Sequence, residues 1–363
     1  MTRLCGRVTF FWNMKMPSGQ KISSSLTGSA IRLTPDDASR LASEYFGVAG
    51  TASALTGERD ENFLIRAGKT FVLKITHPDE DRGAVSFQTE ALLRVAAVDP
   101  GLPTPRVLPA KNGKHEVEFQ DRAGAIRTLR LLSFLPGVMA ARQPQSSGFR
   151  LRLGNILARF DRALEGFSHR SDSYELSWDI SQAGKLRPLL PEVTEANRAD
   201  AERALDHFDL AVAPALSGLR HQVIHNDLNP FNVLVDETDP SRITGLLDFG
   251  DMIRAPLIND LAIACAYQVG RGGDPLAPVL EVVAGYHGIN PLRAEECDLI
   301  YDLMATRLAM TVLIAEWRAA RHPENRPYIL KNHPAAVTGL IELGAIARTE
   351  AQCRFRRACG LET

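Results

Sequence analysis

Hydrophobic and polar positions first form a regular pattern after residue 33. The segment T-P-D-D at residues 34–37 supplies an N-cap threonine, a proline at the first helical position and early acidic residues. The pattern predicts a helix that begins after Thr34 and ends near Gly47. Apolar residues recur at helical spacing between these points: Ala38, Leu41, Ala42 and Tyr45.

Short apolar runs separated by turn residues dominate the part of the chain that follows. Residues 62–66 and 70–75 are joined by A-G-K and predict a β-hairpin. Residues 85–98 have the 3.6-residue period of a helix, which P-G-L-P-T-P ends. This half therefore predicts a small sheet crossed by one main helix. Its further strands are predicted at residues 107–108, 117–119 and 126–134.

The pattern changes character at L-P-G, residues 135–137. Beyond it the chain is helix-like, apart from strands around residues 223–249. We expect an α+β fold with a small β-rich lobe over residues 31–134, a larger and mainly helical lobe over residues 135–363, and a cleft at the join near Ser133 to Gly137. The helices of the larger lobe are predicted at residues 149–166, 197–217, 256–270, 275–287, 294–321 and 334–358.

Composition and charge narrow the class of protein. The chain has 363 residues, of which 45% are hydrophobic and 23% charged, as in ordinary folded proteins. Its 42 basic and 43 acidic residues give a net charge of −1, which excludes the broad positive surface of a nucleic-acid binder or a polybasic membrane anchor. No apolar run approaches the roughly 18 residues that span a membrane. We expect a soluble protein with small-molecule partners.

The cysteines indicate the compartment. They are odd in number, scattered, and free of the close Cys or His pairs that zinc needs. We expect reduced thiols in a cytoplasmic protein. The five residues are Cys5, Cys265, Cys297, Cys353 and Cys359.

The first 35 residues contain no Asp or Glu, but several Arg and Lys among many Ser and Thr. This balance loosely resembles an organelle transit peptide, so mitochondrial import is an alternative to a cytoplasmic location. The favoured interpretation is a disordered extension over residues 1–30. It is either a flexible tail or a segment upstream of a true start at Met14 or Met16.

A polar loop, H-N-D-L-N-P-F-N at residues 225–232, separates two short apolar runs. Downstream, R-I-T-G-L-L-D-F-G-D delivers Asp248 at the end of a strand, so Asp227, Asn232 and Asp248 are expected at neighbouring strand ends. Such a set suits phosphoryl transfer. Asp227 accepts the proton of an attacking hydroxyl, while Asn232 and Asp248 hold Mg²⁺ against the phosphates of a nucleoside triphosphate. Hard oxygen ligands favour Mg²⁺ over zinc.

The spacing H-x-D-x-x-x-x-N followed by D-F-G matches the kinase signature. A kinase also needs a strand lysine that grips the α- and β-phosphates, and a helix glutamate that orients this lysine. F-V-L-K-I supplies Lys74 on such a strand, and Q-T-E-A-L-L supplies Glu90 on the next helix. The nucleotide is expected in the cleft at the join, where Ser133 and Leu135 are assigned to its site.

Two departures separate the chain from protein kinases, since it has neither a G-x-G-x-x-G loop nor an A-P-E segment. It instead resembles the aminoglycoside and choline kinase-like family, and most closely the hydroxylysine kinase branch, over residues 33–345. Asn226 stands where the family loop often has Gly. The matching pieces are G-E-R-D-E-N-F at 57–63, Y-E-L-S-W-D-I at 174–180, H-N-D-L-N-P-F-N-V-L-V at 225–235 and L-L-D-F-G-D-M-I-R-A-P-L-I-N-D-L-A-I-A at 246–264.

The resemblance implies a protein-kinase-like two-lobed fold and GTP- or ATP-dependent phosphorylation of a hydroxyl on an amino-acid-like molecule, with 5-hydroxy-L-lysine as the leading candidate. It also implies that Gly57 lets backbone N–H groups approach the phosphates, that Asn62 braces this loop, and that Asp260 braces the catalytic loop. The structural alternatives are a polar turn at residues 57–63 and a helix cap at Asp260. His225 is expected to bond backbone near the D-F-G turn and to shape the loop.

Several residues are candidates for selecting the acceptor molecule. Asp251 and Arg254 are placed to meet the ammonium and the carboxylate of an amino acid, or else form a surface ion pair. The other candidates are Trp178 with Asp179, and Glu316, Trp317 and Arg318 on the long helix.

Rival interpretations concern the acceptor and the presence of catalysis. Homoserine, ethanolamine or choline, methylthioribose and aminoglycosides are rival acceptors. An aromatic content of 7% disfavours a cage for choline, and no rich cluster of acids is present for an aminoglycoside. The rival from another class is a catalytically silent, nucleotide-binding pseudokinase module. A homodimer is compatible with the sequence but not specified by it.

Overall fold

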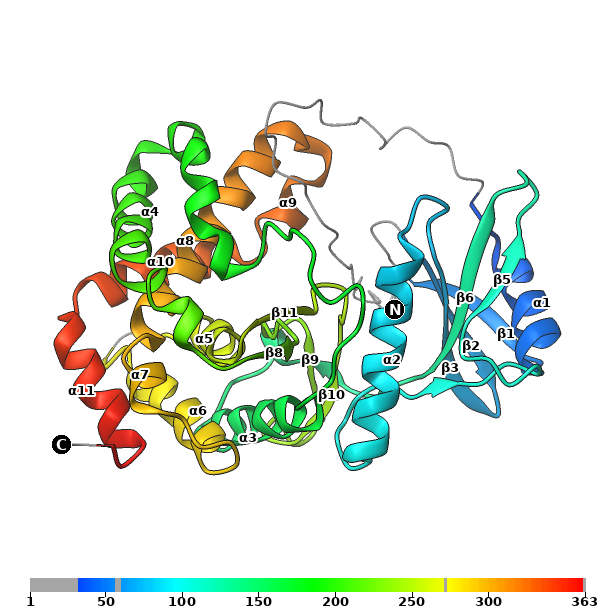
Figure 1. Cartoon of the computed structure of the whole chain (residues 1–363). Coiled ribbons are helices and arrows are strands. Elements are labelled where there is room, and N and C mark those ends of the chain that lie inside the picture. Colours follow the sequence, from blue (N-terminus) through cyan, green and yellow to red (C-terminus); the bar gives the residue numbers. More distant parts are fainter. Residues whose placement is uncertain (1–31, 56–59, 271–272, 362–363) are drawn as a thin grey trace.

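The structure is a computed structural model that describes residues 32–55, 60–270 and 273–361. It has the expected α+β architecture, with a sheet-containing N-terminal lobe beside a larger helical lobe (Figure 1). Two predictions, the extension over residues 1–30 and the role of Gly57, lie outside the described residues. Within the described ranges, no helix is long and apolar enough to cross a membrane.

An antiparallel sheet of six strands forms the N-terminal lobe, in the order β1-β2-β3-β6-β4 with β5 paired to β6. The predicted hairpin and the later strands are confirmed. Strand β1 was not predicted, because T-A-S-A-L contains a single large apolar residue. The bounds are β1 Thr51–Leu55, β2 Glu61–Ala67, β3 Lys69–Ile75, β4 Val107–Leu108, β5 Val117–Gln120 and β6 Ile126–Ser133.

Helix α1 (Pro35–Phe46) begins and ends as predicted. The Thr34 side chain accepts a hydrogen bond from the backbone N–H of Asp37, and Gly47 ends the helix with a φ of +71°. The apolar side of α1 packs on one face of the sheet, against a cluster that includes Leu73 and Ile75.

The other face of the sheet meets helix α2 (Arg82–Val98). Successive side chains of a strand point to opposite faces, so Lys74 lies on the face opposite Leu73 and Ile75. Arg130 pairs with Lys74 across β3 and β6 and bonds to residues of α2, which identifies this face as the α2 side. Strand alternation therefore explains how Lys74 reaches the cleft.

Helices and two small sheets form the C-terminal lobe. One sheet has the order β10-β9-β7 and the other pairs β11 with β8. The strands are β7 Val138–Met139, β8 His221–Ile224, β9 Val233–Val235, β10 Ile243–Leu246 and β11 Ile253–Pro256. The helices are α3 Ser147–Ala163, α4 Glu195–His207, α5 Leu257–Ala266, α6 Ala277–His287, α7 Ala294–Cys297, α8 Ile300–Arg321, α9 Arg326–Ile329, α10 His333–Gly344 and α11 Arg348–Ala358.

Several predicted helices are shorter or divided in the structure. The helix predicted at 197–217 ends at His207 and continues as a wider π turn over residues 208–212. Residues 294–321 form α7 and α8, and residues 334–358 form α10 and α11. The sequence pattern missed β7, β11 and the 3₁₀ segment Ile180–Glu192, because short or proline-containing elements have little periodicity.

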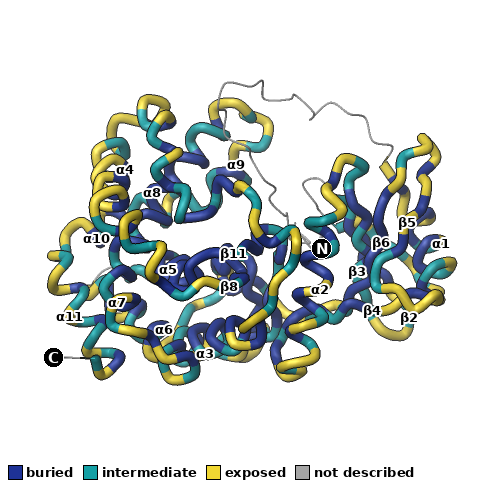
Figure 2. Tube along the Cα trace, viewed as in Figure 1, coloured by how far each residue is buried: buried dark blue, intermediate teal, exposed yellow. Residues whose placement is uncertain are grey.

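The core of the larger lobe surrounds α5, in which all ten residues are buried. Figure 2 shows the most buried segments around α5, β8 and β11, while α4 exposes many residues at the edge. Helix α5 follows β11 directly, and β11 pairs with β8, the strand that leads into residues 225–232. The buried α5 therefore anchors this strand pair in the core.

Contacts between the lobes fix α2 against the larger lobe. The Arg159 guanidinium donates two hydrogen bonds of 2.8 Å to the Asp99 carboxylate at the end of α2. The Phe87 ring stacks on Phe167, with 6.2 Å between centroids. Helix α2 is therefore held to the larger lobe at two points along its length.

Candidate active site

The loop at residues 225–232, here called the catalytic loop, connects β8 to β9. Apolar residues fix it to the core, since Leu228 is 1% exposed and packs within the cluster around α5. The Asp260 carboxylate accepts hydrogen bonds from the backbone N–H groups of His225 at 2.7 Å and Asn226 at 2.9 Å. The bracing contact expected of Asp260 is thus present. The alternative of a helix cap is wrong, because the residue before the first turn of α5 is Pro256.

His225 links the catalytic loop to the D-F-G turn. Its Nε2 lies 3.0 Å from the backbone oxygen of Leu247, which is the contact that the sequence predicts. The His225 ring also packs against Phe249 and Phe160, at centroid distances of 5.1 and 5.8 Å. His225 is fully buried and therefore holds the loop rather than facing a ligand.

Two residues of this region have left-handed backbone conformations. Asn226 has a φ of +64° and Asp248 a φ of +63°. Glycine adopts this conformation without cost, and asparagine and aspartate tolerate it better than other residues. This explains why Asn226 can stand at a position where related loops often have glycine.

The Asp227 carboxylate is held on both oxygens. Its Oδ1 accepts a 2.6 Å hydrogen bond from Nη2 of Arg307, a buried residue of α8. Its Oδ2 accepts from Nδ2 of Asn229 at 2.9 Å and from Nδ2 of Asn232 at 2.8 Å. Asn232 also donates to the backbone oxygen of Asp227, so its amide nitrogen is engaged and its Oδ1 is the atom available to a metal ion.

Asp248 lies close enough to Asp227 for the two charges to interact. Burial, followed by repulsion from Asp227, raises the pKa of Asp248 to about 7, while Lys74 and Lys331 act in the opposite direction. Two carboxylates drawn together in this way favour a cation between them. Within the described ranges, no three His, Cys, Asp or Glu side chains are grouped as a metal site. A site made of one carboxylate and one amide suits Mg²⁺, which usually completes its shell with phosphate oxygens and water.

Lys74 belongs to a polar row across three strands. Asn62 of β2 pairs with Lys74, and Lys74 pairs with Arg130 of β6. Burial, followed by repulsion from Arg130, lowers the pKa of Lys74, whereas Asp60, Asp248 and Glu80 act in the opposite direction. Asn62, predicted to brace the neighbouring loop, donates to the backbone oxygen of Asp60 at 3.4 Å. The partly buried Lys74 and the buried Arg130 lie side by side and form a local positive charge that suits phosphate groups.

The structure corrects the prediction for Glu90. Its side chain is 54% exposed and lies 3.8 Å from Nε2 of His169, so it does not pair with Lys74. The reason is helical phase, since the buried face of α2 passes through Gln88, Thr89 and Leu92. Gln88 Oε1 accepts a 3.1 Å hydrogen bond from Nη2 of Arg130. Carboxylates near Lys74 come from other segments instead.

The join between the lobes contains Ser133 and Leu135. Ser133 Oγ accepts a 2.8 Å hydrogen bond from the backbone N–H of Arg106. Leu135 packs over Gly245 of β10, where an added Cβ would come within 3.1 Å of its Cδ1. The Leu135 contact ties the join to β10, which ends shortly before Asp248. Their assignment to the nucleotide stays a prediction.

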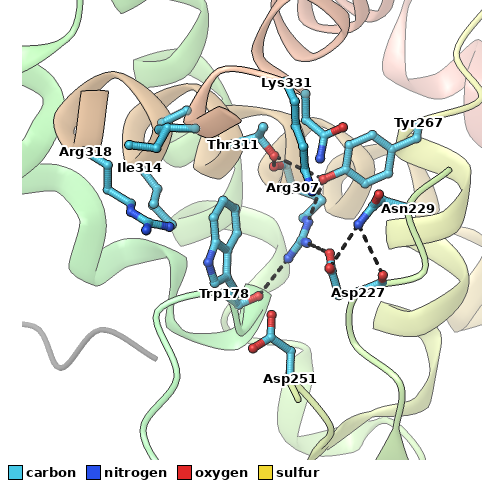
Figure 3. Close-up of a pocket in the computed structure, with 13 residues that line it drawn as sticks. Trp178, Asp227, Asn229, Asp251, Tyr267, Arg307, Thr311, Ile314, Arg318 and Lys331 are labelled. Atoms are coloured by element: carbon cyan, nitrogen blue, oxygen red, sulfur yellow. Dashed lines mark hydrogen bonds and ion pairs between the residues drawn. The ribbon is translucent and has the colours of Figure 1, made fainter. Parts of the chain in front are cut away.

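A pocket that is partly open to solvent lies against Asp227 and is here called the acceptor pocket. Arg307 lies at its centre (Figure 3). The Arg307 guanidinium bonds to Asp227, donates to the backbone oxygen of Trp178 at 3.0 Å, and stacks 4.8 Å from the centroid of the Trp178 ring. The lining residues are Trp178, Asp227, Asn229, Asp251, Tyr267, Arg307, Thr311, Ile314, Ala315, Arg318, Ile329, Lys331 and Asn332.

Not all of the predicted acceptor residues reach this pocket. Trp178, Asp251 and Arg318 line it, but Arg254 and Trp317 do not. Arg254 bonds to the Asp172 carboxylate at 3.0 Å and to a backbone oxygen, because it lies on β11 facing the preceding loop. The predictions that Arg254 and Trp317 contact the acceptor are therefore wrong. The Trp317 ring packs against the core of the larger lobe, and the Arg321 guanidinium lies 4.6 Å from the centroid of this ring. Glu316 bonds to Thr194, Asn197 and His333.

Sequence reasoning missed Arg307, Asn229, Tyr267 and Lys331. A signal for Arg307 was present, since it is the single charged residue in the run L-M-A-T-R-L-A-M-T-V-L-I-A at 303–315. A charge inside an apolar helix is expected to have a buried partner. Lys331 gave no comparable signal because it lies in an ordinary polar stretch between two helices.

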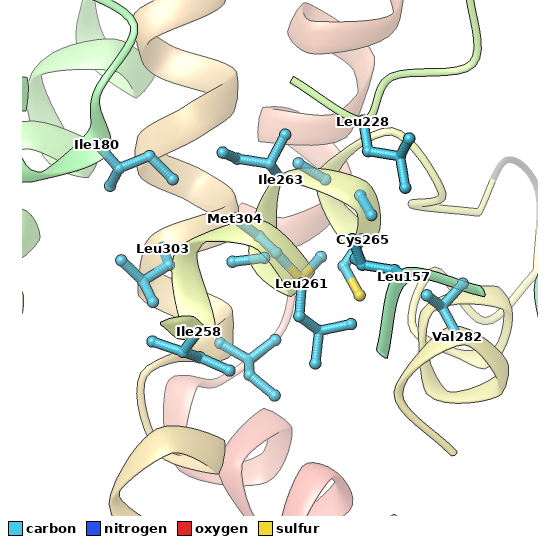
Figure 4. Close-up of a cluster of buried hydrophobic side chains, with 14 of the residues drawn as sticks. Leu157, Ile180, Leu228, Ile258, Leu261, Ile263, Cys265, Val282, Leu303 and Met304 are labelled. Carbon is cyan, nitrogen blue, oxygen red and sulfur yellow. The ribbon is translucent and has the colours of Figure 1, made fainter. Parts of the chain in front are cut away.

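The packing behind the site explains how distant segments meet there. Leu228 of the catalytic loop, Leu261 and Ile263 of α5, and Leu303 and Met304 of α8 belong to one cluster (Figure 4). This cluster fixes α8 beside the catalytic loop, so that Arg307, three residues beyond Met304, reaches Asp227. The geometry therefore joins a catalytic loop, a polar row with Lys74 and an acceptor pocket that is partly open to solvent.

Comparison with known proteins agrees with this geometry. Residues 51–297 match the model of the phosphotransferase enzyme family, APH, which is more than half of the chain. The chain belongs to the phosphotransferase enzyme family. Members of this family transfer phosphoryl groups, and the catalytic loop with Asp227 falls inside the matched residues.

Curated relatives of this phosphotransferase include vertebrate enzymes. It is 27% identical to the hydroxylysine kinase of Xenopus laevis, over 85% of this chain and 88% of that protein. It is 25% identical to the hydroxylysine kinase of Mus musculus, over 87% of this chain and 90% of that protein. Together with the family match, these relatives indicate a small-molecule phosphotransferase.

Solved structures share the fold of this phosphotransferase. A spectinomycin phosphotransferase in complex with ADP and spectinomycin has a TM-score of 0.60 at 13% identity, with 88% of this chain and 99% of that chain covered. A microcompartment-associated aminopropanol kinase has a TM-score of 0.57 at 19% identity, with 89% and 98% covered. The kinase-like two-lobed fold is confirmed.

Proposed function

We propose that this phosphotransferase transfers the terminal phosphoryl group of ATP or GTP to the hydroxyl of 5-hydroxy-L-lysine or a close hydroxylated amino acid. The hydroxylysine kinases among its relatives support this acceptor. The single observation that carries the proposal is the Asp227 carboxylate, which is fixed on both oxygens and borders a pocket lined by both acidic and basic side chains.

Asp227 is the group that accepts the hydroxyl proton. Its hydrogen bonds to Arg307, Asn229 and Asn232 hold the carboxylate in one orientation. A fixed base needs no reorganisation when the hydroxyl attacks, so positioning contributes directly to the rate. Arg307 is a positioning residue in this scheme, because it acts through Asp227.

Asn232 and Asp248 are the residues that would hold Mg²⁺. Hard oxygen donors and the mutual repulsion of Asp227 and Asp248 fit this ion. Bound there, Mg²⁺ would neutralise charge on the transferring phosphoryl group.

Two cations border the phosphate path from opposite sides. Lys74 reaches from β3, and its charge interacts with Asp248. Lys331 lines the acceptor pocket, lies 5.0 Å from the Phe231 ring of the catalytic loop, and also interacts with Asp248. We assign Lys74 to the phosphates of the nucleotide and Lys331 to the transferring phosphoryl group, where a positive charge stabilises the transition state.

A substrate panel tests the proposal. The purified protein is assayed for consumption of ATP and of GTP with Mg²⁺ and each of 5-hydroxylysine, homoserine, ethanolamine, choline and an aminoglycoside. Consumption that depends on 5-hydroxylysine and exceeds that with the other acceptors is the expected result. Tight nucleotide binding without consumption for any acceptor would instead identify a silent nucleotide-binding module.

A further inference from the structure

One face of α8 forms a wall along the length of the acceptor pocket. Arg307, Thr311, Ile314, Ala315 and Arg318 all line the pocket, at helical spacing. A rise of about 1.5 Å per residue separates the two arginines by roughly 16 Å along the helix axis. Arg307 is bound to Asp227, so Arg318 marks the opposite end of the wall.

The end of the pocket near Asp227 contains one further acid. Asp227 pairs with Arg307, and Asp251, which is 5% exposed, lines the same end of the pocket and interacts electrostatically with Arg307. In Figure 3, Asp251 lies below Asp227, while Arg318 lies beyond the Trp178 ring. A cationic group next to the reacting hydroxyl would therefore meet Asp251.

The middle of the pocket is apolar. The Trp178 ring, 4.8 Å from the Arg307 guanidinium, lines the pocket together with Ile314 and Ala315 of α8. Such apolar groups suit a short methylene chain. The two acids of the pocket, Asp227 and Asp251, thus lie at the Arg307 end, and Arg318 lies at the other end of the α8 wall.

We propose that Arg318 binds a carboxylate at the end of the acceptor remote from the phosphorylated hydroxyl, and that Asp251 binds an ammonium group beside that hydroxyl. This rests on the proposed function, and it specifies the acceptor class as an amino acid whose side chain ends in an amino alcohol. Arg318 disfavours polycationic acceptors, because it would face an ammonium group with a like charge.

The experiment crosses two acceptors with two variants. The acceptors are 5-hydroxylysine and 1,5-diamino-2-pentanol, which has the same amino alcohol but no carboxylate. Arg318→Gln is expected to lower kcat/KM for 5-hydroxylysine by ~10- to 100-fold, mainly through KM, as for the loss of a charged hydrogen bond. The diamine should react with Arg318→Gln as well as with the wild type, or better. Asp251→Asn should lower kcat/KM for both acceptors.

Two matched variants act as controls. Arg321→Gln removes an arginine from the same helix, but one that pairs with Glu192 outside the pocket, and should leave both reactions unchanged. Arg318→Lys keeps the charge and should restore part of the activity with 5-hydroxylysine. An equal loss for both acceptors in Arg318→Gln, or no loss for either, would overturn the assignment of Arg318.

A binding measurement separates this inference from the proposed reaction. If the wild type phosphorylates neither acceptor, the proposed substrate is wrong, and calorimetric titration with L-lysine and cadaverine decides the role of Arg318. Binding of lysine that is tighter than that of cadaverine, with the difference lost in Arg318→Gln, supports the carboxylate site. Equal binding, or no binding of lysine, contradicts it.

Discussion

The catalytic loop and the acceptor pocket are built in opposite ways. The catalytic loop places Asp227 and Asn232 within residues 225–232, and Asp248 follows on the next strand pair. The acceptor pocket instead collects residues from Trp178 to Asn332, on several helices and loops. Phosphoryl chemistry is therefore a local property of the chain, whereas acceptor choice is a property of the tertiary packing.

Arg307 is the residue at which the two regions meet. It lines the acceptor pocket and also binds the Asp227 carboxylate at 2.6 Å. The comparison therefore predicts that changes in the catalytic loop affect every acceptor equally, that changes at the remote end of the pocket depend on the acceptor, and that Arg307 affects both.

Asp227→Asn should have the largest effect. Loss of the base is expected to lower kcat by ~10²- to 10⁴-fold for every acceptor, because the amide that replaces the carboxylate cannot accept the hydroxyl proton. Nucleotide binding should stay within about twofold of the wild type, since the amide keeps the shape of the side chain. Titration with a fluorescent nucleotide and steady-state kinetics measure the two quantities. Asp206→Asn, at an exposed site, is the matched control, and a near-normal kcat in Asp227→Asn would refute the assigned base.

Arg307→Met should have the next largest effect. It leaves the buried Asp227 Oδ1 without its charged donor, so we expect a loss of about 3 kcal/mol in the free energy of unfolding and a fall of ~10²-fold in kcat, as for removal of one preorganised donor. Chemical denaturation and steady-state kinetics measure these changes. Arg307→Lys keeps the charge and should recover stability more than activity, because the lysine lacks the planar group that stacks on Trp178. Unchanged kcat in both variants would show that Arg307 does not position Asp227 for catalysis.

The affinity for Mg²⁺ should change with pH by about one order of magnitude. Asp248 must lose its proton to bind Mg²⁺, and burial with the neighbouring Asp227 raises its pKa to about 7 in the metal-free protein. Protons therefore compete below pH 7, and the apparent affinity for Mg²⁺ should be about tenfold higher at pH 8 than at pH 6. Titration of nucleotide binding with Mg²⁺ at constant ionic strength measures this. Asp248→Asn should retain only the dependence that belongs to the nucleotide, and identical slopes in both proteins would contradict the assignment.

Asn226→Gly should have the smallest effect. Asn226 is buried with a φ of +64°, and neither polar atom of its side chain has a hydrogen-bond partner in the described part of the chain. Glycine removes the strain and the buried amide but adds entropy to the unfolded chain, so stability should rise by at most about 1 kcal/mol, with activity retained. Asn226→Ala keeps a Cβ in the left-handed region and should lower the melting temperature. Loss of activity in Asn226→Gly would show that the amide has a role of its own.

The sequence predicted what is local in the molecule. The T-P-D-D cap, the hairpin around A-G-K and the catalytic loop each depend on residues close together in the chain, and each lies in the structure where it was expected. The contacts of His225 and Asp260 could also be expected from the motif that contains them.

The sequence could not predict features that depend on helical phase or on long-range packing. Glu90 has the expected distance from Lys74 along the chain, but the buried face of α2 passes through Gln88 instead. Trp317 and Arg318 are adjacent in sequence, yet only Arg318 faces the acceptor pocket. Lys331 reaches the pocket only because α8 and α10 pack around it, which no local pattern records.

Identification of the phosphorylated atom tests the central claim most directly. The enzyme is incubated with 5-hydroxylysine, Mg²⁺ and ATP or GTP, and the product is examined by ¹H–³¹P correlated NMR. The account predicts a phosphate ester coupled to the proton on C5, formed by the wild type and lost in Asp227→Asn. Inorganic phosphate alone, or phosphorus bonded to nitrogen, would contradict a reaction in which Asp227 accepts the proton of the acceptor hydroxyl.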